Sequence, residues 1–225
     1  MKLLGISLLI ICLFGVVSAQ TKKKVFVIGD SISIQYGPYL KKFIEGKYLY
    51  DRKRDNGEAM QDLNKPVGAN GGDSRMVVEY LETLQKDKNF SADILLVNCG
   101  LHDIKTDRKT GKKAIELDEY RANLMKIRKL TKKMKLKLIW INSTPVNDEI
   151  HNSKNVGFFR YTKDAEAYNE AAGKYFEKER VPMIDLNSFS RKFPLEAFSD
   201  HVHYKSEYSQ LQAAFIAGFL LNMNL

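Results

Sequence analysis

Two short polar motifs near opposite ends of the sequence contain the residue types needed for nucleophilic catalysis. Gly29-Asp30-Ser31 directly follows an apolar run, and Asp200-His201-Val202-His203 lies close to the C-terminus. A serine hydroxyl becomes a nucleophile when a histidine accepts its proton, and an aspartate can hold that histidine in the required tautomer. Together the two motifs indicate acyl transfer by a serine, a histidine and an aspartate.

Two further polar segments could stabilise the negative charge that develops on a carbonyl oxygen in such a reaction. Asn70-Gly71-Gly72-Asp73-Ser74 precedes a segment of helical pattern, and its small residues let backbone N–H groups approach an oxyanion. Gly100-Leu101-His102-Asp103 follows a second apolar run. In an open parallel sheet the ligand crevice lies beyond the carboxyl ends of the strands. We therefore expect both segments to meet Ser31 there.

The sequence predicts neither a metal site nor a nucleotide cofactor. His102 and Asp103, with the two histidines of the C-terminal motif, lack a separate carboxylate cluster at metal-ligand spacing. The glycine-containing stretch at 68–72 lacks the lysine and hydroxyl of a phosphate-binding loop. We expect no cofactor.

Apolar runs and segments of helical period alternate along the chain, as they do when strands and helices alternate. Runs at 25–28, 94–97, 136–141 and 183–186 predict strands buried on both faces, and a weaker run at 48–50 predicts an edge strand. Helices are predicted at 76–86, 117–134, 162–179 and 206–221. The fold class is therefore α/β, a doubly wound, mostly parallel sheet with helices on both faces.

Between these elements, the stretches at 55–72 and 142–157 are expected to be loops that shape the substrate site. Within the predicted helix at 117–134, Lys126, Lys129 and Lys133 fall on a face away from the apolar residues. We interpret this lysine row as the solvated outer face of a helix, not as a binding stripe.

The N-terminus has the pattern of a secretory signal. Lys2 precedes an apolar stretch at 3–17, and Val17-Ser18-Ala19 is a small-residue cleavage site. We expect a signal peptide at 1–19, cleavage near Ala19-Gln20, one domain at 20–225, and a secreted or periplasmic protein. The stretch is too short for a comfortable spanning helix, so an uncleaved anchor is the less favoured alternative and no stable membrane insertion is expected after cleavage.

The composition limits the partners of the chain. Its 36 Lys and Arg residues exceed its 27 Asp and Glu residues, which gives a net charge of +9. An acidic partner such as an anionic polysaccharide fits this charge, whereas export and the lack of a recognisable motif disfavour nucleic acid. After cleavage Cys99 is the only cysteine, so no internal disulfide can form. Nothing in the sequence indicates an oligomeric state.

Over nearly the whole mature chain the arrangement resembles the GDSL esterase and lipase family, also called SGNH hydrolases, whose four blocks supply a serine, a glycine, an asparagine and a histidine. The resemblance implies a flavodoxin-like three-layer sandwich. It implies that Ser31 is the nucleophile and that its backbone N–H contributes to the oxyanion hole. Gly72 is implied as the second oxyanion donor, although Gly71 is only one residue away.

The third and last blocks complete this comparison. The third block of the family usually reads Gly-x-Asn-Asp, and His102 here replaces the asparagine. A neutral imidazole could still donate to the oxyanion, and Asn70 or Asn98 could compensate. In the last block the resemblance implies Asp200 as the acid and His203 as the base, because the family spacing of three residues selects His203 over His201.

Other polar residues fall at the expected edge of the site. Asp30, Asn70, Asp103 and His151 are possible contacts of the substrate. Asn147 and Arg160, in the same region as His151, could also reach a substrate, but ordinary surface loop positions are the default expectation for all three.

The function that these observations favour is a serine ester hydrolase that removes a small acyl group, expected to be acetyl, from a carbohydrate. The expected partner is thus an acylated small molecule or polysaccharide. One alternative is a lipase, lysophospholipase or thioesterase with the same triad, in which the aromatic stretch at 158–161 forms an acyl-pocket wall. The other is a non-catalytic carbohydrate-binding protein of the same fold, which the histidine at position 102 makes conceivable.

Overall fold

The computed structural model describes residues 21–154 and 156–223. The predicted signal peptide and its cleavage site lie outside this range. Within the described range, no helix is both long enough and apolar enough to cross a membrane.

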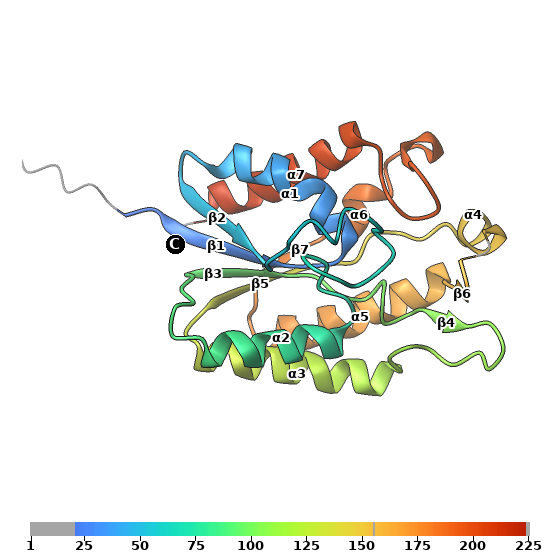
Figure 1. Cartoon of the computed structure of the whole chain (residues 1–225), viewed down its shortest axis with the longest axis horizontal. Helices are drawn as coiled ribbons and strands as arrows, with labels where there is room; N and C mark the ends of the chain where they lie inside the picture. Colours follow the sequence, from blue (N-terminus) through green and yellow to red (C-terminus); the bar gives the residue numbers. More distant parts are fainter. Residues whose placement is uncertain (1–20, 155, 224–225) are drawn as a thin grey trace, which may run out of the picture.

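A parallel sheet of five strands forms the centre of the fold (Figure 1). Its strand order is β2-β1-β3-β5-β7, and every pairing is parallel. The strands are β1 (Lys23–Ile28), β2 (Tyr48–Arg52), β3 (Ile94–Val97), β5 (Lys137–Ile141) and β7 (Met183–Ile184). All five predicted strands are therefore present, and β2 lies at the edge as predicted.

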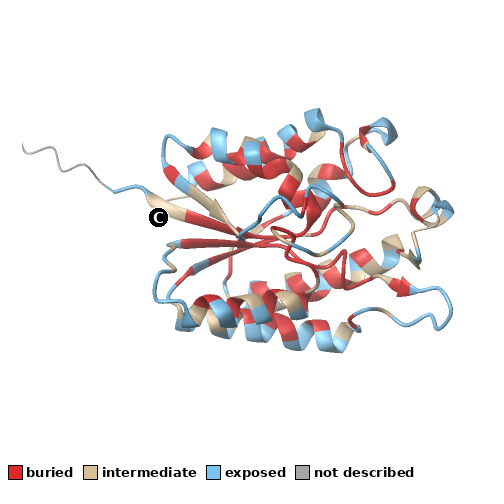
Figure 2. Cartoon of the chain, in the orientation of Figure 1, coloured by how far each residue is buried: buried red, intermediate tan, exposed pale blue. Residues whose placement is uncertain are grey.

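Helices cover both faces of the sheet, which gives the three layers (Figure 1). On one face, α1 (Ser31–Ile44) packs against α7 (Ser206–Asn222), with the short α6 (Leu186–Ser190) beside them. The other face carries α2 (Ser74–Lys86), α3 (Leu117–Lys133) and α5 (Thr162–Lys178). Buried residues are concentrated on the strands and on the helix faces turned toward them (Figure 2). The predicted α/β fold class is thus confirmed.

Some elements differ from those predicted from the sequence. Leu186 was expected to end a strand, but it begins α6 because the Asp185 side chain accepts a hydrogen bond from Ser188 N–H and caps a helix there. The predicted loop at 142–157 contains the short helix α4 (Asp148–Ser153). β4 (Thr106–Asp107) and β6 (Phe158–Phe159) form a small antiparallel pair beside it. A single 3₁₀ turn, η1 (Leu195–Ala197), precedes the C-terminal motif.

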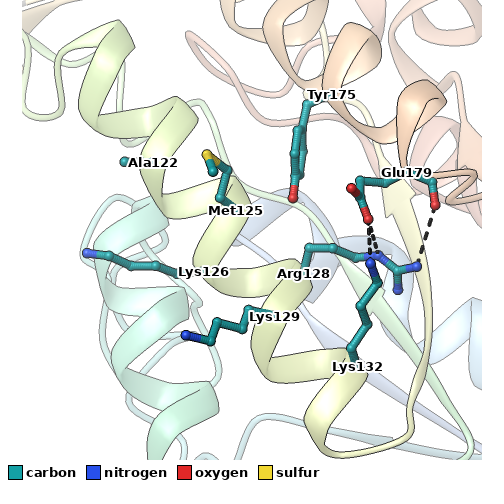
Figure 3. A pocket seen from close by; sticks show the side chains of 8 residues that line it. All are labelled: Ala122, Met125, Lys126, Arg128, Lys129, Lys132, Tyr175 and Glu179. Carbon is teal, nitrogen blue, oxygen red and sulfur yellow. Dashed lines mark hydrogen bonds and ion pairs between the residues drawn. The ribbon is translucent and has the colours of Figure 1, made fainter.

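The lysine row of α3 faces solvent, as predicted from the spacing of the apolar residues. Lys126, Lys129 and Lys133 are all exposed. A shallow groove runs between this face and α5 (Figure 3). At one end of the groove, Glu179 forms ion pairs with Lys132 at 2.7 Å and with Arg128 at 3.3 Å, so its carboxylate already has basic partners.

Candidate active site

The end of β1 and the start of α1 position Ser31. Asp30 is the N-cap of α1, and its Oδ1 accepts a hydrogen bond from Ile32 N–H at 3.0 Å. Gly29 passes so close to the helix that a Cβ there would lie 2.8 Å from Ser33 Cβ. Ser31 is the first residue of the helix, where backbone N–H groups have no acceptor within the helix. Its N–H therefore has no acceptor within α1 and lies at the positive end of the helix.

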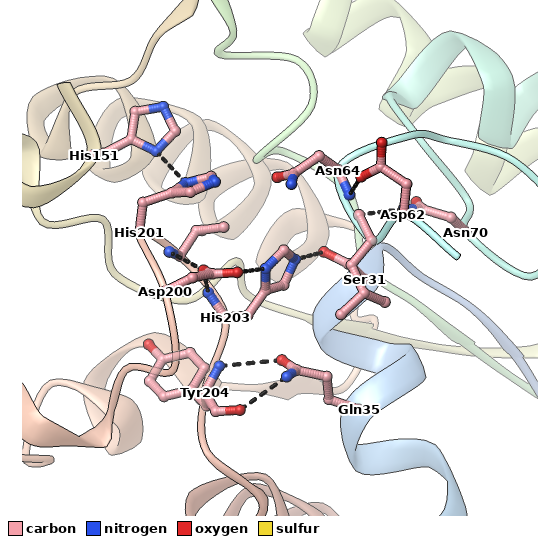
Figure 4. A network of polar contacts seen from close by, with 12 residues as sticks. Ser31, Gln35, Asp62, Asn64, Asn70, His151, Asp200, His201, His203 and Tyr204 are labelled. Carbon is pink, nitrogen blue, oxygen red and sulfur yellow. Dashed lines mark hydrogen bonds and ion pairs between the residues drawn. The ribbon is translucent and has the colours of Figure 1, made fainter. Parts of the chain in front are cut away.

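Ser31, His203 and Asp200 form a continuous hydrogen-bonded line (Figure 4). His203 Nε2 lies 2.8 Å from Ser31 Oγ, and His203 Nδ1 lies 2.6 Å from Asp200 Oδ2. The other carboxylate oxygen of Asp200 accepts the backbone N–H groups of Val202 and His203, each at 2.8 Å. Burial opposes ionisation of Asp200, but these hydrogen bonds outweigh it and hold its pKa well below the ordinary value. Asp200 is therefore an anion that orients the imidazole.

Gln35 ties the helix that carries the nucleophile to the loop that carries the base. Its Nε2 donates to the carbonyl of Tyr204 at 2.8 Å, and its Oε1 accepts Tyr204 N–H at 3.2 Å (Figure 4). Gln35 lies one helical turn after Ser31, and Tyr204 directly follows His203. Sequence reasoning did not single out Gln35, because a glutamine on a helix carries no signal of a partner 169 residues away.

Replacing Gln35 with leucine should lower kcat for an ester substrate by about ten- to a hundredfold, because small displacements of a base from its nucleophile have effects of this size. KM should change little, since the side chain holds the loop and not the substrate. Gln35→Glu keeps the acceptor for Tyr204 N–H and should retain an intermediate rate. The exposed Gln210→Leu on α7 is the matched control. Equal losses in Gln35→Leu and Gln210→Leu would contradict this role.

The glycines of the predicted oxyanion hole are close to Ser31 but already engaged. Gly72 has φ +71°, and a Cβ there would lie 2.4 Å from Met76 Sδ, so only glycine fits without strain. Its N–H donates to Asn70 Oδ1 at 3.0 Å, and Gly71 N–H donates to Gly29 O at 2.8 Å. Gly72 stays a predicted oxyanion donor whose N–H is engaged by Asn70 in this structure. Gly72 N–H would have to leave Asn70 or be shared with it.

Asn70 and Asp103, expected as possible substrate contacts, are buried and hydrogen bonded to neighbouring backbone groups. Asn70 is fully buried, and its Nδ2 donates to the carbonyls of Leu63 and Lys65. Asp103 is also fully buried and accepts Ser74 N–H at 2.9 Å, which holds the start of α2 against the loop after β3. Burial raises the pKa of Asp103 to about 7. Both side chains are thus buried and hydrogen bonded within the loops around the site.

His102 lies in the site with no hydrogen bond to its ring from the described residues. The residue is 4% exposed, and burial, followed by the charges of Lys105, Arg160 and His203, lowers its pKa well below the ordinary value. The ring is therefore neutral at pH 7 and can donate one hydrogen bond. The suggested substitute Asn98 is occupied, because its Nδ2 donates to the Ile141 carbonyl at 3.0 Å. The amide group of Asn70 is likewise in use.

His151 and His201 form a buried pair beside the triad. Their Nδ1 atoms lie 2.8 Å apart, so one ring donates and the other accepts (Figure 4). Burial lowers the pKa of both, and that of His151 falls to about 3. His151 is therefore neither a surface loop residue nor placed like a substrate contact. Across the described residues, no group of three or more His, Cys, Asp and Glu side chains is placed to hold a metal ion.

The two remaining residues of this region also differ from surface positions. Asn147 is half-buried and caps α4, because its Oδ1 accepts Ile150 N–H at 2.9 Å. Arg160 is only 3% exposed, and its Nε donates to the carbonyl of Leu101 at 2.7 Å. The aromatic residues on either side of Arg160 in the sequence are the one signal of burial that was available. The Asp30 carboxylate is also buried, and its Oδ2 has no hydrogen-bond partner.

Comparison with known proteins gives the family. The sequence pattern of the GDSL-like lipase/acylhydrolase family matches residues 25–216. No curated protein is significantly similar in sequence. Similar solved structures include a GDSL-like lipase from Bacteroides thetaiotaomicron, with a TM-score of 0.59 and 16% identity over 89% of each chain. An acetyl xylan esterase has a TM-score of 0.65 and 15% identity, over 88% of this chain and 99% of that one.

A lipase/acylhydrolase from Enterococcus faecalis is similar too, with a TM-score of 0.57 and 17% identity over 88% of this chain and 95% of that one. At such identities these structures show a shared fold. The family match, in contrast, includes β1, the glycine-rich loop, the loop after β3 and the C-terminal motif. The chain therefore belongs to the GDSL-like lipase/acylhydrolase family.

Proposed function

We propose that this protein is an exported serine esterase that removes a small acyl group, acetyl first of all, from a carbohydrate. The observation that carries the proposal is the unbroken line from Ser31 Oγ to His203 Nε2 at 2.8 Å and from His203 Nδ1 to Asp200 Oδ2 at 2.6 Å. These are the contacts that a serine nucleophile, its general base and the carboxylate that orients the base require.

The reaction follows from this geometry in two steps. Ser31 Oγ attacks the ester carbonyl carbon while His203 Nε2 takes the hydroxyl proton, and the same proton then passes to the departing alcohol oxygen. This leaves an acyl group on Ser31. In the second step His203 takes a proton from water, the resulting hydroxide attacks the acyl carbon, and Ser31 regains its proton as the acid leaves. Asp200 stabilises the imidazolium in both steps.

The negative charge on the carbonyl oxygen has a natural place at the start of α1. The Ser31 N–H and the positive end of the helix macrodipole favour an anion there. His102 is the neutral side chain available as a further donor, and Gly72 N–H becomes one if it leaves Asn70. A single donor of this kind typically contributes about 3 to 4 kcal/mol to the stability of the transition state.

The surroundings of Ser31 favour a small acyl group on a polar substrate. His102, His201 and Arg160 are polar and buried around the triad, where a long acyl chain would need apolar contacts. One of the similar structures is an acetyl xylan esterase. The excess of basic residues and the secretory pattern of the first residues fit an acidic substrate outside the cytoplasm.

Rates with p-nitrophenyl acetate, butyrate and octanoate test the acyl specificity. We expect kcat/KM to fall by about tenfold or more from acetate to octanoate, because the buried polar side chains of His102, His201 and Arg160 offer few apolar contacts to added methylenes. Acetate release from acetylated xylan or acetylated sugars tests the alcohol side. A preference for octanoate would instead favour the lipase alternative. Absence of turnover with every ester, in a folded protein that still binds sugars, would favour the binding-protein alternative.

A further inference from the structure

Arg160 is a buried cation that forms no ion pair with the residues that the structure describes. It is 3% exposed, and its Nε donates to the carbonyl of Leu101. Its Nη1 is buried with no hydrogen-bond partner. None of the ion pairs among the described residues includes it. A buried and unpaired guanidinium is costly, so a protein that retains one without an internal partner has reason to use it for a ligand.

A second cation lies on the same aromatic ring. The Arg160 Cζ atom is 4.9 Å from the centroid of the Phe158 ring, and Lys105 Nζ is 4.7 Å from it. Lys105 Nζ also donates to the carbonyl of Asn64 at 3.2 Å, which fixes the ammonium beside the loop before the glycine-rich segment. Burial and the charge of Arg160 lower the pKa of Lys105 to about 8. Two cations on one ring repel each other, and an anion near both would stabilise them.

This pair of cations is connected to the triad by direct contacts. The Phe158 ring lies 5.5 Å from the ring of His151, which is hydrogen bonded to His201 in the catalytic loop. On the other side, the carbonyl that holds Arg160 belongs to Leu101, the neighbour of His102. The guanidinium is thus hydrogen bonded to the loop after β3 and linked to the catalytic loop through Phe158 and His151.

The charge of Arg160 acts on Asp30, the residue that directly precedes Ser31. Burial raises the pKa of this carboxyl, while the charges of Arg160 and His203 act on it in the opposite direction. The Asp200 carboxylate acts on Arg160 in turn. Neither aspartate forms an ion pair with it among the described residues, and Nη1 is left buried without an acceptor, which a carboxylate entering the site would supply.

We propose that Arg160, assisted by Lys105, binds a carboxylate of the substrate next to the scissile ester, so that the preferred substrate is an acylated acidic sugar. The planar guanidinium offers parallel N–H groups that match the two oxygens of a carboxylate. Its burial strengthens the attraction, because little water remains to screen it. This inference rests on the proposed function of Ser31, since it names the substrate class of the same site.

The kinetic test compares acetate release from O-acetylated glucuronic acid and from its methyl ester, in which a methyl group removes the charge of the carboxylate. The wild-type protein should release acetate from the acid with a kcat/KM about ten- to a hundredfold higher than from the methyl ester. This is the usual effect of a charged hydrogen bond. Arg160→Gln should bring this ratio close to one, and Lys105→Gln should reduce it. The exposed Arg121→Gln on α3 should leave the ratio of the wild type. Equal losses on both esters in Arg160→Gln, or no preference in wild type, would overturn the proposal.

A binding test separates this inference from the proposed function, because it needs no turnover. The Ser31→Ala protein is melted with glucuronate and with methyl glucuronate ester. Glucuronate alone should raise Tm, and the rise should vanish when Arg160→Gln is added. If Arg160→Gln fails to fold, Lys105→Gln in the same background decides, since it should weaken the rise. An equal effect of both sugars on Ser31→Ala would show that no carboxylate is recognised, even if the esterase activity is real.

Discussion

Replacing Ser31 with alanine is expected to lower kcat for p-nitrophenyl acetate by about 10⁴-fold or more, because the alanine leaves no oxygen to form the acyl-enzyme. His203 would retain its contact with Asp200, so the fold and the melting temperature should change little. Steady-state rates and a melting curve on the same preparation make the comparison. Ser91→Ala, an exposed serine before β3, is the matched control and should keep the rate of wild type.

Covalent labelling with a fluorophosphonate, detected by mass spectrometry, tests independently whether Ser31 is the nucleophile. A fluorophosphonate should add one group to the wild-type chain, on the peptide that contains Ser31, and none to Ser31→Ala. An adduct on another serine, or a Ser31→Ala protein with the rate of wild type, would exclude Ser31 as the nucleophile and with it the proposed mechanism.

Replacing Asp200 with asparagine is expected to lower kcat by about 10³- to 10⁴-fold without disrupting the loop. The asparagine oxygen can still accept the backbone N–H groups of Val202 and His203. Its amide N–H, however, would donate to His203 Nδ1, so the ring proton would be on Nε2. A protonated Nε2 cannot accept the proton of Ser31. Asp118→Asn, a highly exposed carboxyl on α3, is the matched control. A loss of less than tenfold in Asp200→Asn would show that another group orients His203.

The lowered pKa of Asp200 also makes a prediction about stability. A carboxyl whose folded pKa lies below its unfolded value of about 3.9 contributes stability that is fully present above that value. The contribution is lost as the pH falls through the folded pKa. The difference in Tm between wild type and Asp200→Asn should therefore be constant near neutral pH and shrink below about pH 4. A difference that grows on acidification would contradict the sign.

The elements that could be predicted from the sequence are those with long or strongly apolar patterns. The four buried runs stand out because parallel strands covered on both faces carry almost no polar residues. No helix was predicted over α1, since Gly37 and Pro38 lie in its middle and disfavour a helix locally. The surrounding packing of α1 against α7 overrides them. β4 and β6, with two residues each, are too short for any periodicity to show.

The features of the candidate site likewise divide into those that could be predicted from the sequence and those that could not. The motifs that contain Ser31 and His203 could be found because neighbours in the sequence define them. The engagement of Gly72 N–H by Asn70 could not, since the sequence does not show where a side chain points. Arg160 was expected on the surface for the same reason. A charged residue is exposed in most proteins, and only tertiary contacts reveal one that is buried.

The pairing of α1 with α7 has a consequence for how the protein acquires its activity during synthesis. Ser31 and His203 are separated by 172 residues, and the helix that follows His203 ends at Asn222. A chain emerging from the ribosome therefore exposes its serine long before the partner histidine exists. Ester cleavage would begin only when the final helix docks beside the first. Hydrolysis would therefore report that the C-terminal helix has reached its native place beside α1.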